Sequence, residues 1–433
     1  MGYTEVSEAL LGFIDESPSP FHAVRNIEKL LEGYTKLNEE DKWELIPGEA
    51  YYVCRNSSSI IAFRLPKNAP DGFLIGAAHT DCPAFKLKTD PEMGVDDEYV
   101  KLNVEKYGGM LMSTWFDRPL SIAGRVVVKN GNKLETKLVD LKKGCAIIPN
   151  LAIHMNRQAN DGYSYNAQKD MLPLVGSKKG RIAEEIAKAA GVEKENVISG
   201  DLFLYNSMKG CFTGIDGEYV SSRALDDLMC AWAMTEGLKN SQPAGNKVAM
   251  AAIFDNEEVG STTKQGADSS FLSDVISRIA DAYAMNGEAL KRAYANSFMV
   301  SADNGHALHP NYAETSNPKV HPVMNGGVVI KYNANQKYTT DAVSDAVFRT
   351  VCEKAGVPCQ SYHNRSDIAG GSTLGNISGS HVSIPTVDIG LAQLAMHSSY
   401  ETAGAKDAEY LLLAIEGFFG SDIKVSGGTV TVE

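Results

Sequence analysis

The chain has 433 residues, of which 43% are hydrophobic and 22% are charged, and this is enough apolar surface for one large core or two ordinary ones. Lys and Arg total 41 against 54 Asp and Glu, which gives a formal net charge of -13, and no stretch concentrates the basic residues. The composition excludes disordered and fibrous proteins, and it makes nucleic acid and anionic membranes poor candidate partners.

Two further features bear on the compartment. No apolar run approaches the ~20 residues that cross a bilayer, and the first residues lack the basic and then apolar pattern of a secretory signal. The seven cysteines are scattered and never form a Cys-x-x-Cys pair, which fits neither a disulfide framework nor a thiolate zinc site. We therefore expect a soluble protein of the cytoplasm whose cysteines are reduced.

The N-terminal segment predicts two amphipathic helices. Apolar residues recur at helical spacing from Val6 to Ile14, the pattern breaks at the Ser-Pro-Ser-Pro of residues 17–20, and it resumes from Val24 to Leu31.

Short apolar runs with strand character then alternate with helical patterns. The runs are Phe73 to Ala78, Val248 to Phe254, Phe298 to Ala302, Val328 to Ile330 and Thr386 to Ile389. The helical patterns are Leu225 to Leu238, Phe271 to Tyr283 and Asp341 to Ala355. This alternation predicts an α/β fold in which helices cover both faces of a sheet.

The middle of the chain has a different pattern. From about Thr89 to Val220, strand-like pieces are separated by Gly and Asn turns, which predicts a β-rich insertion. We place this inserted domain at residues 89–222 and a discontinuous α/β domain at residues 1–88 plus 223–433.

Acidic and imidazole side chains follow several strand-like runs. His79 and Asp303 each come directly after a run, and Glu257 with Glu258 comes shortly after another. Open α/β sheets bind their ligands at the carboxyl ends of strands, and a mixture of imidazoles and carboxylates suits zinc or a similar divalent metal. The candidate set is His79, Asp226, Glu257, Glu258, Asp303 and His397.

Each of these residues also has an ordinary structural interpretation. A histidine after a strand is more often a core or turn residue than a ligand, and adjacent glutamates commonly begin a solvated helix. Two like charges after a buried strand are nevertheless costly unless a cation or a proton compensates them. In such a pair, one carboxylate can hold a metal while its neighbour transfers a proton.

Several blocks along nearly the whole chain resemble one family, the aspartyl aminopeptidases and the vacuolar leucine aminopeptidase, which are dinuclear zinc exopeptidases. The blocks are Gly76 to Pro83, Trp115 to Arg118, Ser222 to Asp227, Asp255 to Ser261, Asp303 with His306 to Tyr312, and Gln393 to His397. The resemblance implies two divalent metal ions per chain, which we expect to be Zn²⁺, with Co²⁺ or Mn²⁺ as alternatives.

The resemblance also implies how the ligands divide between the two metals. His79 and Asp303 hold one metal, Glu258 and His397 hold the other, and Asp226 bridges them.

Further roles follow from the same resemblance. Glu257 is implied as the general base, and Asp81 is expected to accept a hydrogen bond from the second ring nitrogen of His79. Asp227 replaces an Asn that commonly follows the bridging aspartate, and we expect it to face away from the site. Ser113 stands where some members have a His that is thought to reach a neighbouring subunit's active site.

Three more residues are candidates for substrate binding. Lys331, Tyr338 and His306 match blocks that lie near the substrate in the family, although Lys331 and Tyr338 taken alone would be surface residues. A cationic Lys331 would favour acidic side chains.

The resemblance implies a three-layer zinc-exopeptidase domain, interrupted by a β-rich dimerisation domain whose dimers build a dodecamer. The expected function is a metal-dependent aminopeptidase that releases N-terminal residues, Asp or Glu in particular, from short peptides. Two alternatives remain: an amidohydrolase that deacylates small molecules, and a non-catalytic oligomeric scaffold with a structural metal site. Glu257 disfavours the scaffold, because a structural site needs no proton carrier.

Overall fold

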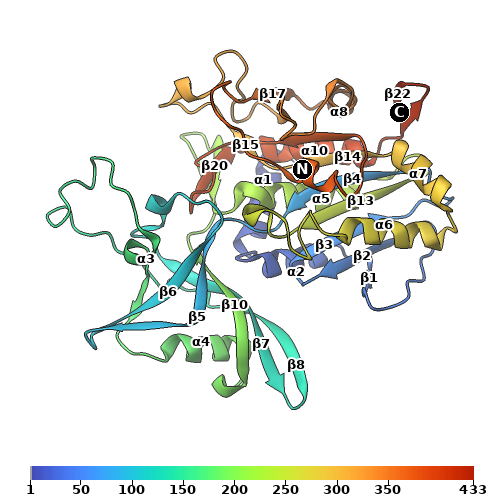
Figure 1. Cartoon of the computed structure of the whole chain (residues 1–433). Helices are drawn as coiled ribbons and strands as arrows, with labels where there is room; N and C mark the ends of the chain where they lie inside the picture. Colours follow the sequence, from blue (N-terminus) through green and yellow to red (C-terminus); the bar gives the residue numbers. More distant parts are fainter. Residues whose placement is uncertain (1) are drawn as a thin grey trace.

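A nine-stranded sheet forms the centre of the molecule in a computed structural model that describes residues 2–433 (Figure 1). Its strand order is β1 (Thr35–Leu37), β2 (Ala50–Arg55), β3 (Ser59–Arg64), β13 (Lys247–Phe254), β4 (Gly72–His79), β14 (Phe298–Ala302), β18 (Thr386–Gly390), β16 (Val328–Tyr332) and β17 (Cys359–His363). The central strands β13, β4, β14 and β18 run parallel to one another.

Helices cover both faces of this sheet, as Figure 1 shows. On one face the core contains residues of α1 (Tyr3–Asp15), α2 (Pro20–Leu30), α5 (Leu225–Asn240), α8 (Ala342–Ala355) and α10 (Asp407–Phe419). On the other face it contains residues of α6 (Phe271–Ala282), α7 (Gly287–Ala295) and α9 (Leu374–Ser378). The predicted α/β fold, with helices on both faces, is therefore confirmed.

The apolar runs form central strands because they are covered from both sides. Every residue of β4 and of β13 is buried, so neither strand alternates between apolar and polar positions. Their neighbour β14 is likewise buried along its whole length. Since β13, β4 and β14 are parallel, their carboxyl ends meet at one edge of the sheet.

A second sheet of six antiparallel strands lies beside the first, at the lower left of Figure 1. Its order is β8 (Lys133–Asp140), β7 (Leu120–Asn130), β10 (Val197–Asn206), β5 (Ala84–Val95), β6 (Tyr99–Tyr107) and β9 (Leu174–Gly176). It has its own hydrophobic core, to which α4 (Arg181–Ala190) contributes, and α3 (Ala167–Asp170) lies near β6. We call this sheet with its helices the inserted sheet.

The boundaries expected for the insertion differ from the limits of the inserted sheet. Residue 89 lies within β5, and the last part of the range contains β11 (Cys211–Thr213) and β12 (Tyr219–Ser222). These two strands join a third sheet, ordered β11, β12, β20 (Glu401–Gly404), β19 (Ala392–Leu394) and β15 (Gly305–His306). A hairpin of β21 (Ile423–Ser426) and β22 (Thr429–Val432) follows, and the 3₁₀ turns are η1 (Met112–Trp115), η2 (Lys194–Asn196), η3 (Glu257–Val259) and η4 (Ala313–Thr315).

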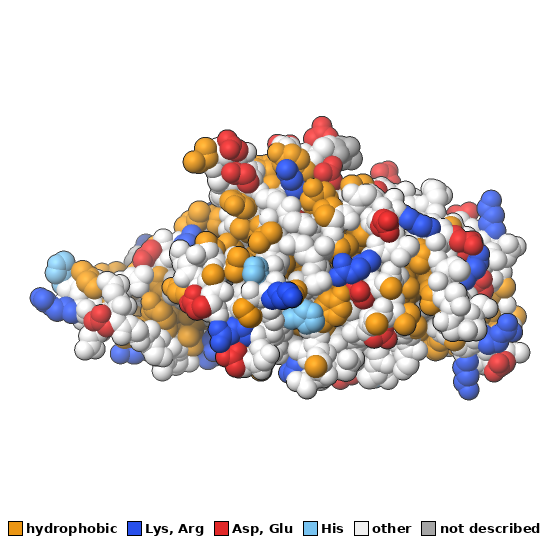
Figure 2. All heavy atoms as spheres, turned by 90° about the horizontal axis from the view of Figure 1, so that it is seen from above, with side chains coloured by type: hydrophobic (Ala, Val, Ile, Leu, Met, Phe, Trp, Pro, Cys, Tyr) orange, Lys and Arg blue, Asp and Glu red, His pale blue; other side chains and the backbone are white. Residues whose placement is uncertain are grey.

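The surface seen from above in Figure 2 carries acidic and basic side chains interspersed with apolar ones. Within residues 2–433, no helix combines the length and the apolar character that a membrane span requires. All seven cysteines are free thiols, as expected. The cytoplasmic location stays a prediction.

Candidate metal centre

The carboxyl edge of the central strands carries three groups of candidate residues. His79 is the last residue of β4, and Asp303 directly follows β14. Glu257 and Glu258 form the 3₁₀ turn η3 just after β13. Because β13 and β14 flank β4 on either side, these side chains meet at the edge of the sheet.

Two further candidates reach this edge from other elements. Asp226 lies at the start of α5, where the backbone of Asp226 (φ -86°, ψ 108°) and Asp227 (φ -123°, ψ 21°) is not yet helical. His397 follows β19 in a loop and has a left-handed backbone, with φ 64°.

Asp226 lies between the two imidazoles. Its Oδ1 is 3.6 Å from Nε2 of His79, and its Oδ2 is 3.4 Å from Nε2 of His397. Nε2 of His397 is also 3.4 Å from Oε1 of Glu258. The two oxygens of one carboxylate thus face two different histidines.

Potential ligand atoms gather in three overlapping groups at this edge. Within each group, the atoms all lie within 4.8 Å of one another. The groups are His79 with Asp226, Asp227 and Asp303; Asp226 with Glu258 and His397; and His79 with Glu257 and Glu258. The structure therefore brings all six residues of the candidate set together.

Asp227 does not face away from the site, and that expectation is wrong. Its Oδ2 accepts a hydrogen bond from the backbone N–H of His79 at 3.2 Å and lies 3.9 Å from Nε2 of the same residue. The expectation assumed that Asp226 and Asp227 lie on a regular helix, which points consecutive side chains in different directions. The backbone of both residues is not helical, so both carboxylates can lie near His79.

Asp81 has more partners than expected. Nδ1 of His79 lies 3.0 Å from the backbone carbonyl oxygen of Asp81 and 3.3 Å from its carboxylate. The carboxylate also accepts hydrogen bonds from the backbone N–H groups of Glu257 and Glu258, at 3.1 and 3.2 Å, and from the hydroxyl of Tyr107 at 2.6 Å. Asp81 therefore supports both His79 and the turn that carries the two glutamates.

Burial and like charges act strongly on these acids. Burial, followed by the neighbouring Asp226, raises the pKa of Glu258 well above its usual range. Burial also raises the pKa of Glu257 to about 8 and that of Asp303 to about 6. Burial likewise disfavours the charged form of Asp226, but the two histidines outweigh it and lower the pKa of this carboxyl.

These residues fit a divalent metal. Asp226 Oδ1, Asp227 Oδ1 and Glu258 Oε1 are buried and have no hydrogen-bond partner within the protein. Buried carboxylate oxygens without partners are costly, and a cation is the partner that satisfies both their lone pairs and their charge. Imidazole and carboxylate are ligands that zinc accepts.

A cavity of about 340 Å³ opens onto this cluster, and all three substrate-binding candidates line it. His306 is exposed, whereas Lys331 and Tyr338 are buried, contrary to what these two residues alone suggested. Nζ of Lys331 donates to the backbone oxygen of Asn304 at 3.1 Å, lies 3.8 Å from Oδ1 of Asp303, and sits over the ring of Tyr338. The cavity is thus lined by the candidate metal ligands and by a buried cation, which lies beside one of them, Asp303.

Sequence reasoning missed Glu401, which is also buried at this site. Its carboxylate accepts hydrogen bonds from the backbone N–H groups of Asp226 at 3.0 Å and of His397 at 2.7 Å. A lone glutamate on a short strand gives no local signal of this role, since both partners are distant in sequence or held by a loop.

Comparison with known proteins gives the same picture. The sequence profile described as Aminopeptidase I zinc metalloprotease (M18) matches residues 13–419. A probable M18 family aminopeptidase 2 of Clostridium acetobutylicum is 47% identical over 427 residues, which cover 96% of this chain and 98% of that protein. Its counterpart in Pseudomonas aeruginosa is 40% identical over 429 residues, covering 96% of this chain and 98% of the relative.

Solved structures agree with the sequence matches. The cryo-EM structure of the Ape4 and Nbr1 complex contains a chain with a TM-score of 0.93 and 34% identity, covering 96% of this chain and 86% of that one. The crystal structure of prApe1 has a TM-score of 0.91 and 28% identity, covering 96% and 95%.

The fold, the cluster of ligand atoms and the family match place this protein among the metallopeptidases of the exopeptidase class. This chain belongs to the peptidase M18 family, the aminopeptidase I and aspartyl aminopeptidase type, and its activity is that of an aminopeptidase.

Proposed function

We propose that the chain is a dinuclear metal-dependent aminopeptidase in which Asp226 bridges two divalent cations, Zn²⁺ in the first place. The observation that carries this proposal is the position of the Asp226 carboxylate, whose two oxygens face His79 and His397 separately. Asp303 completes the ligand set beside His79, and Glu258 completes the set beside His397.

The roles of the protein groups follow from this arrangement. Bound cations supply Lewis acidity, which lowers the pKa of water and polarises a peptide carbonyl. Glu257 lines the cavity next to Glu258 and acts as the general base, which takes a proton from the attacking water and returns it to the leaving amine. Asp81 fixes the orientation of the His79 ring and holds the turn that positions both glutamates.

We further propose a preference for peptides that begin with Asp or Glu. Burial works to lower the pKa of Lys331, but Asp303 and other nearby acids outweigh it and raise the pKa, so the side chain remains a cation. A buried ammonium group in the cavity favours an acidic side chain through a charge-assisted hydrogen bond. Tyr338 packs against this cation, and His306 lines the cavity nearby.

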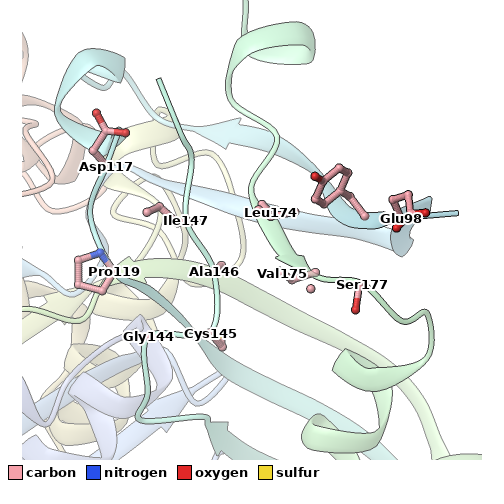
Figure 3. A pocket seen from close by; sticks show the side chains of 12 residues that line it. Glu98, Asp117, Pro119, Gly144, Cys145, Ala146, Ile147, Leu174, Val175 and Ser177 are labelled. Atoms are coloured by element: carbon pink, nitrogen blue, oxygen red, sulfur yellow. The ribbon is translucent and has the colours of Figure 1, made fainter. Parts of the chain in front are cut away.

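The inserted domain, proposed at residues 89–222, is the part that pairs subunits, and we propose that its dimers build a dodecamer. A groove of about 630 Å³ on the inserted sheet is lined by apolar side chains that include Ile147, Leu174 and Val175 (Figure 3). Nearby in sequence, Leu151 and Met155 are exposed. The structure of the S. cerevisiae mApe1 dodecamer supports this proposal, with a TM-score of 0.86 and 28% identity over 96% of this chain and 97% of that one.

One activity panel tests the proposed function. Metal-stripped protein is refilled with Zn²⁺, Co²⁺ or Mn²⁺ and assayed on aminoacyl substrates that begin with acidic and with neutral residues, and on their N-acylated forms. The proposal predicts activity that returns with two equivalents of metal, requires a free amino terminus and is greatest on acidic substrates. Cleavage of N-acylated substrates at equal rate would instead indicate an amidohydrolase.

A further inference from the structure

The end of β6 leaves the inserted sheet and continues along the candidate metal centre. Gly108 has φ +74°, and a Cβ atom added to it would lie 3.1 Å from Cβ of Glu258. A Cβ atom added to Gly109 would lie 3.9 Å from Nδ1 of His397, and the backbone N–H of Leu111 donates to the carbonyl oxygen of His397 at 3.0 Å. The backbone of this segment therefore contacts two of the proposed ligands.

Tyr107, the residue just before this segment, has the most direct connection. Its hydroxyl donates to Oδ2 of Asp81 at 2.6 Å and accepts a hydrogen bond from Nδ2 of Asn256 at 2.8 Å. Asp81 is completely buried, and its two oxygens accept the backbone N–H groups of Glu257 and Glu258. The Tyr107 hydroxyl thus orients the Asp81 carboxylate, which in turn accepts the two N–H groups of the turn that carries Glu257 and Glu258.

Tyr107 and Asn256 are each held in place by further contacts. The ring of Tyr107 packs edge-on against Phe203 in the inserted sheet, with the ring centroids 5.5 Å apart. Asn256 has a left-handed backbone, with φ 63°, and its Oδ1 accepts hydrogen bonds from Thr263 and Gln265, both at 2.8 Å. The Tyr107 hydroxyl therefore joins the inserted sheet to the turn after β13.

We propose that Tyr107 is a positioning residue for the metal centre, so that the inserted sheet supports the site within its own chain as well as carrying the surface proposed for subunit pairing. This inference rests on the proposed metal function. Without the hydroxyl, Oδ2 of the buried Asp81 keeps only the N–H of Glu258, and the turn loses the hydrogen bonds that join it to the inserted sheet through Tyr107. Groups that contact a metal ligand directly, as Asp81 contacts His79, typically contribute about 10- to 100-fold to metal affinity. Tyr107 acts one contact further out, through Asp81, so its contribution lies at the lower end of that range.

The experiment is a Zn²⁺ titration of metal-stripped, full-length protein against a chromogenic chelator, for wild type and Tyr107→Phe. We expect the Kd of at least one zinc to rise by about 10-fold in the variant, the lower end of the range for direct partners of metal ligands. Tyr205→Phe is the matched control, because Tyr205 also lies in the inserted sheet and its hydroxyl donates to a carboxylate, that of Asp140, at 2.7 Å. This control should bind zinc as the wild type does.

A second variant changes Asn256, the residue before Glu257 that donates a hydrogen bond to the Tyr107 hydroxyl. Asn256→Gly tolerates the left-handed backbone but removes the amide that donates to Tyr107. Its loss of affinity and that of Tyr107→Phe should be less than additive in the double variant, because both act through one network. This variant also carries the test if Tyr107→Phe does not fold.

The outcomes separate the two proposals. Wild-type protein that binds no zinc would overturn the proposed function itself. Wild-type protein that binds zinc, with an unchanged Kd in Tyr107→Phe, would overturn the positioning role alone. An equal rise in the Kd of Tyr205→Phe would also overturn that role, because the effect would then be a general loosening of the inserted sheet.

Discussion

The two large sheets compensate their acidic residues in different ways. In the inserted sheet, Asp201 accepts hydrogen bonds from Nζ of Lys86 at 2.8 Å and from Nε of Arg125 at 3.0 Å. Partial burial works to raise the pKa of Asp201, but these two cations outweigh it and lower the pKa overall. At the edge of the nine-stranded sheet, Asp303 has a nearby cation in Lys331, yet burial still raises its pKa to about 6.

The opposite pKa shifts of Asp201 and Asp303 indicate which sheet has acids that the cations of the chain do not fully compensate. In the inserted sheet, Lys86 and Arg125 supply the counter-charges of Asp201. The central sheet gathers several carboxylates around two imidazoles, and some of their buried oxygens have no partner in the protein. The acids at the edge of the central sheet therefore fit metal ions, whereas Asp201 of the inserted sheet is compensated by ion pairs within the chain.

The largest expected effect comes from replacing Asp226 at the candidate metal centre, with Asp201 of the inserted sheet replaced for comparison. Asp226→Ala removes the ligand that both metals are proposed to share, so metal content should fall below two per chain and turnover should fall on the order of 10³-fold, since metals contribute several kcal/mol to such reactions. Asp201→Ala is the control and should keep the metal content and the turnover of the wild type. Elemental analysis and steady-state kinetics provide the readouts, and two metals per chain in Asp226→Ala would exclude the bridge.

The second prediction separates proton transfer from metal binding. Glu257→Gln keeps the size of the side chain but loses the carboxylate, so turnover should fall by a factor on the order of 10² or more while metal content is unchanged. The measurement is kcat on protein whose metal content has been verified. Normal turnover in a fully metallated variant would remove Glu257 from the role of base.

The third prediction concerns the cation of the central cavity. Lys331→Met should lower kcat/KM for acidic substrates by about 10- to 100-fold, because a charge-assisted hydrogen bond contributes about 1.5–3 kcal/mol. Neutral substrates serve as the internal control and should lose much less. Equal losses on both classes would mean that Lys331 supports the cavity without selecting the substrate.

The fourth prediction moves to the surface of the inserted domain. Met155 is 76% exposed, and a charge placed there by Met155→Glu should weaken subunit contacts and lower the particle mass measured by light scattering. Leu134→Glu is the control, because Leu134 is 68% exposed but lies on β8, at the opposite edge of the sheet from β9, whose residues line the groove. Met155 instead lies in the loop that follows Ile147 of the groove. A mass that stays unchanged in Met155→Glu would place the interface elsewhere.

The last prediction is a pH dependence of stability where the two regions meet. His22 lies in α2 next to Phe21, which packs into the core of the inserted sheet. Burial lowers the pKa of His22 from 6.5 to about 4, so the unfolded chain binds the proton more readily. The stability that neutral His22 contributes is therefore complete above pH 6.5 and is lost as the pH falls from 6.5 to 4.

Urea unfolding of wild type and His22→Gln across this range measures the effect. The wild-type free energy of unfolding should fall more steeply with decreasing pH, by up to about 1.4 kcal/mol per pH unit. Parallel slopes for the two proteins would show that His22 is protonated with little cost in the folded state.

The sequence predicted five strands of the central sheet, namely β4, β13, β14, β16 and β18, because these strands are buried and give short continuous apolar runs such as Phe73 to Ala78. The polar residues just after several of these runs mark the carboxyl edge. The remaining strands of this sheet, β1, β2, β3 and β17, were not predicted. The third sheet was not predicted, since strands such as β15 and β19 span only two and three residues.

Other parts of the site depend on contacts that leave no local pattern. Tyr107 and Glu401 each act through at least one partner that is distant in sequence, Asp81 or Asp226, and neither residue stands in a recognisable motif. The position of Asp227 depends on a non-helical backbone inside a predicted helix, which helical spacing does not reveal. The division of ligands between two metals came from family resemblance and remains a proposal.

Anomalous X-ray scattering at the zinc edge from zinc-loaded crystals tests the central claim most directly. The account predicts two peaks per chain, one beside His79 and Asp303 and one beside Glu258 and His397, with one oxygen of Asp226 directed at each. A single peak, or two peaks that do not share Asp226, would contradict it.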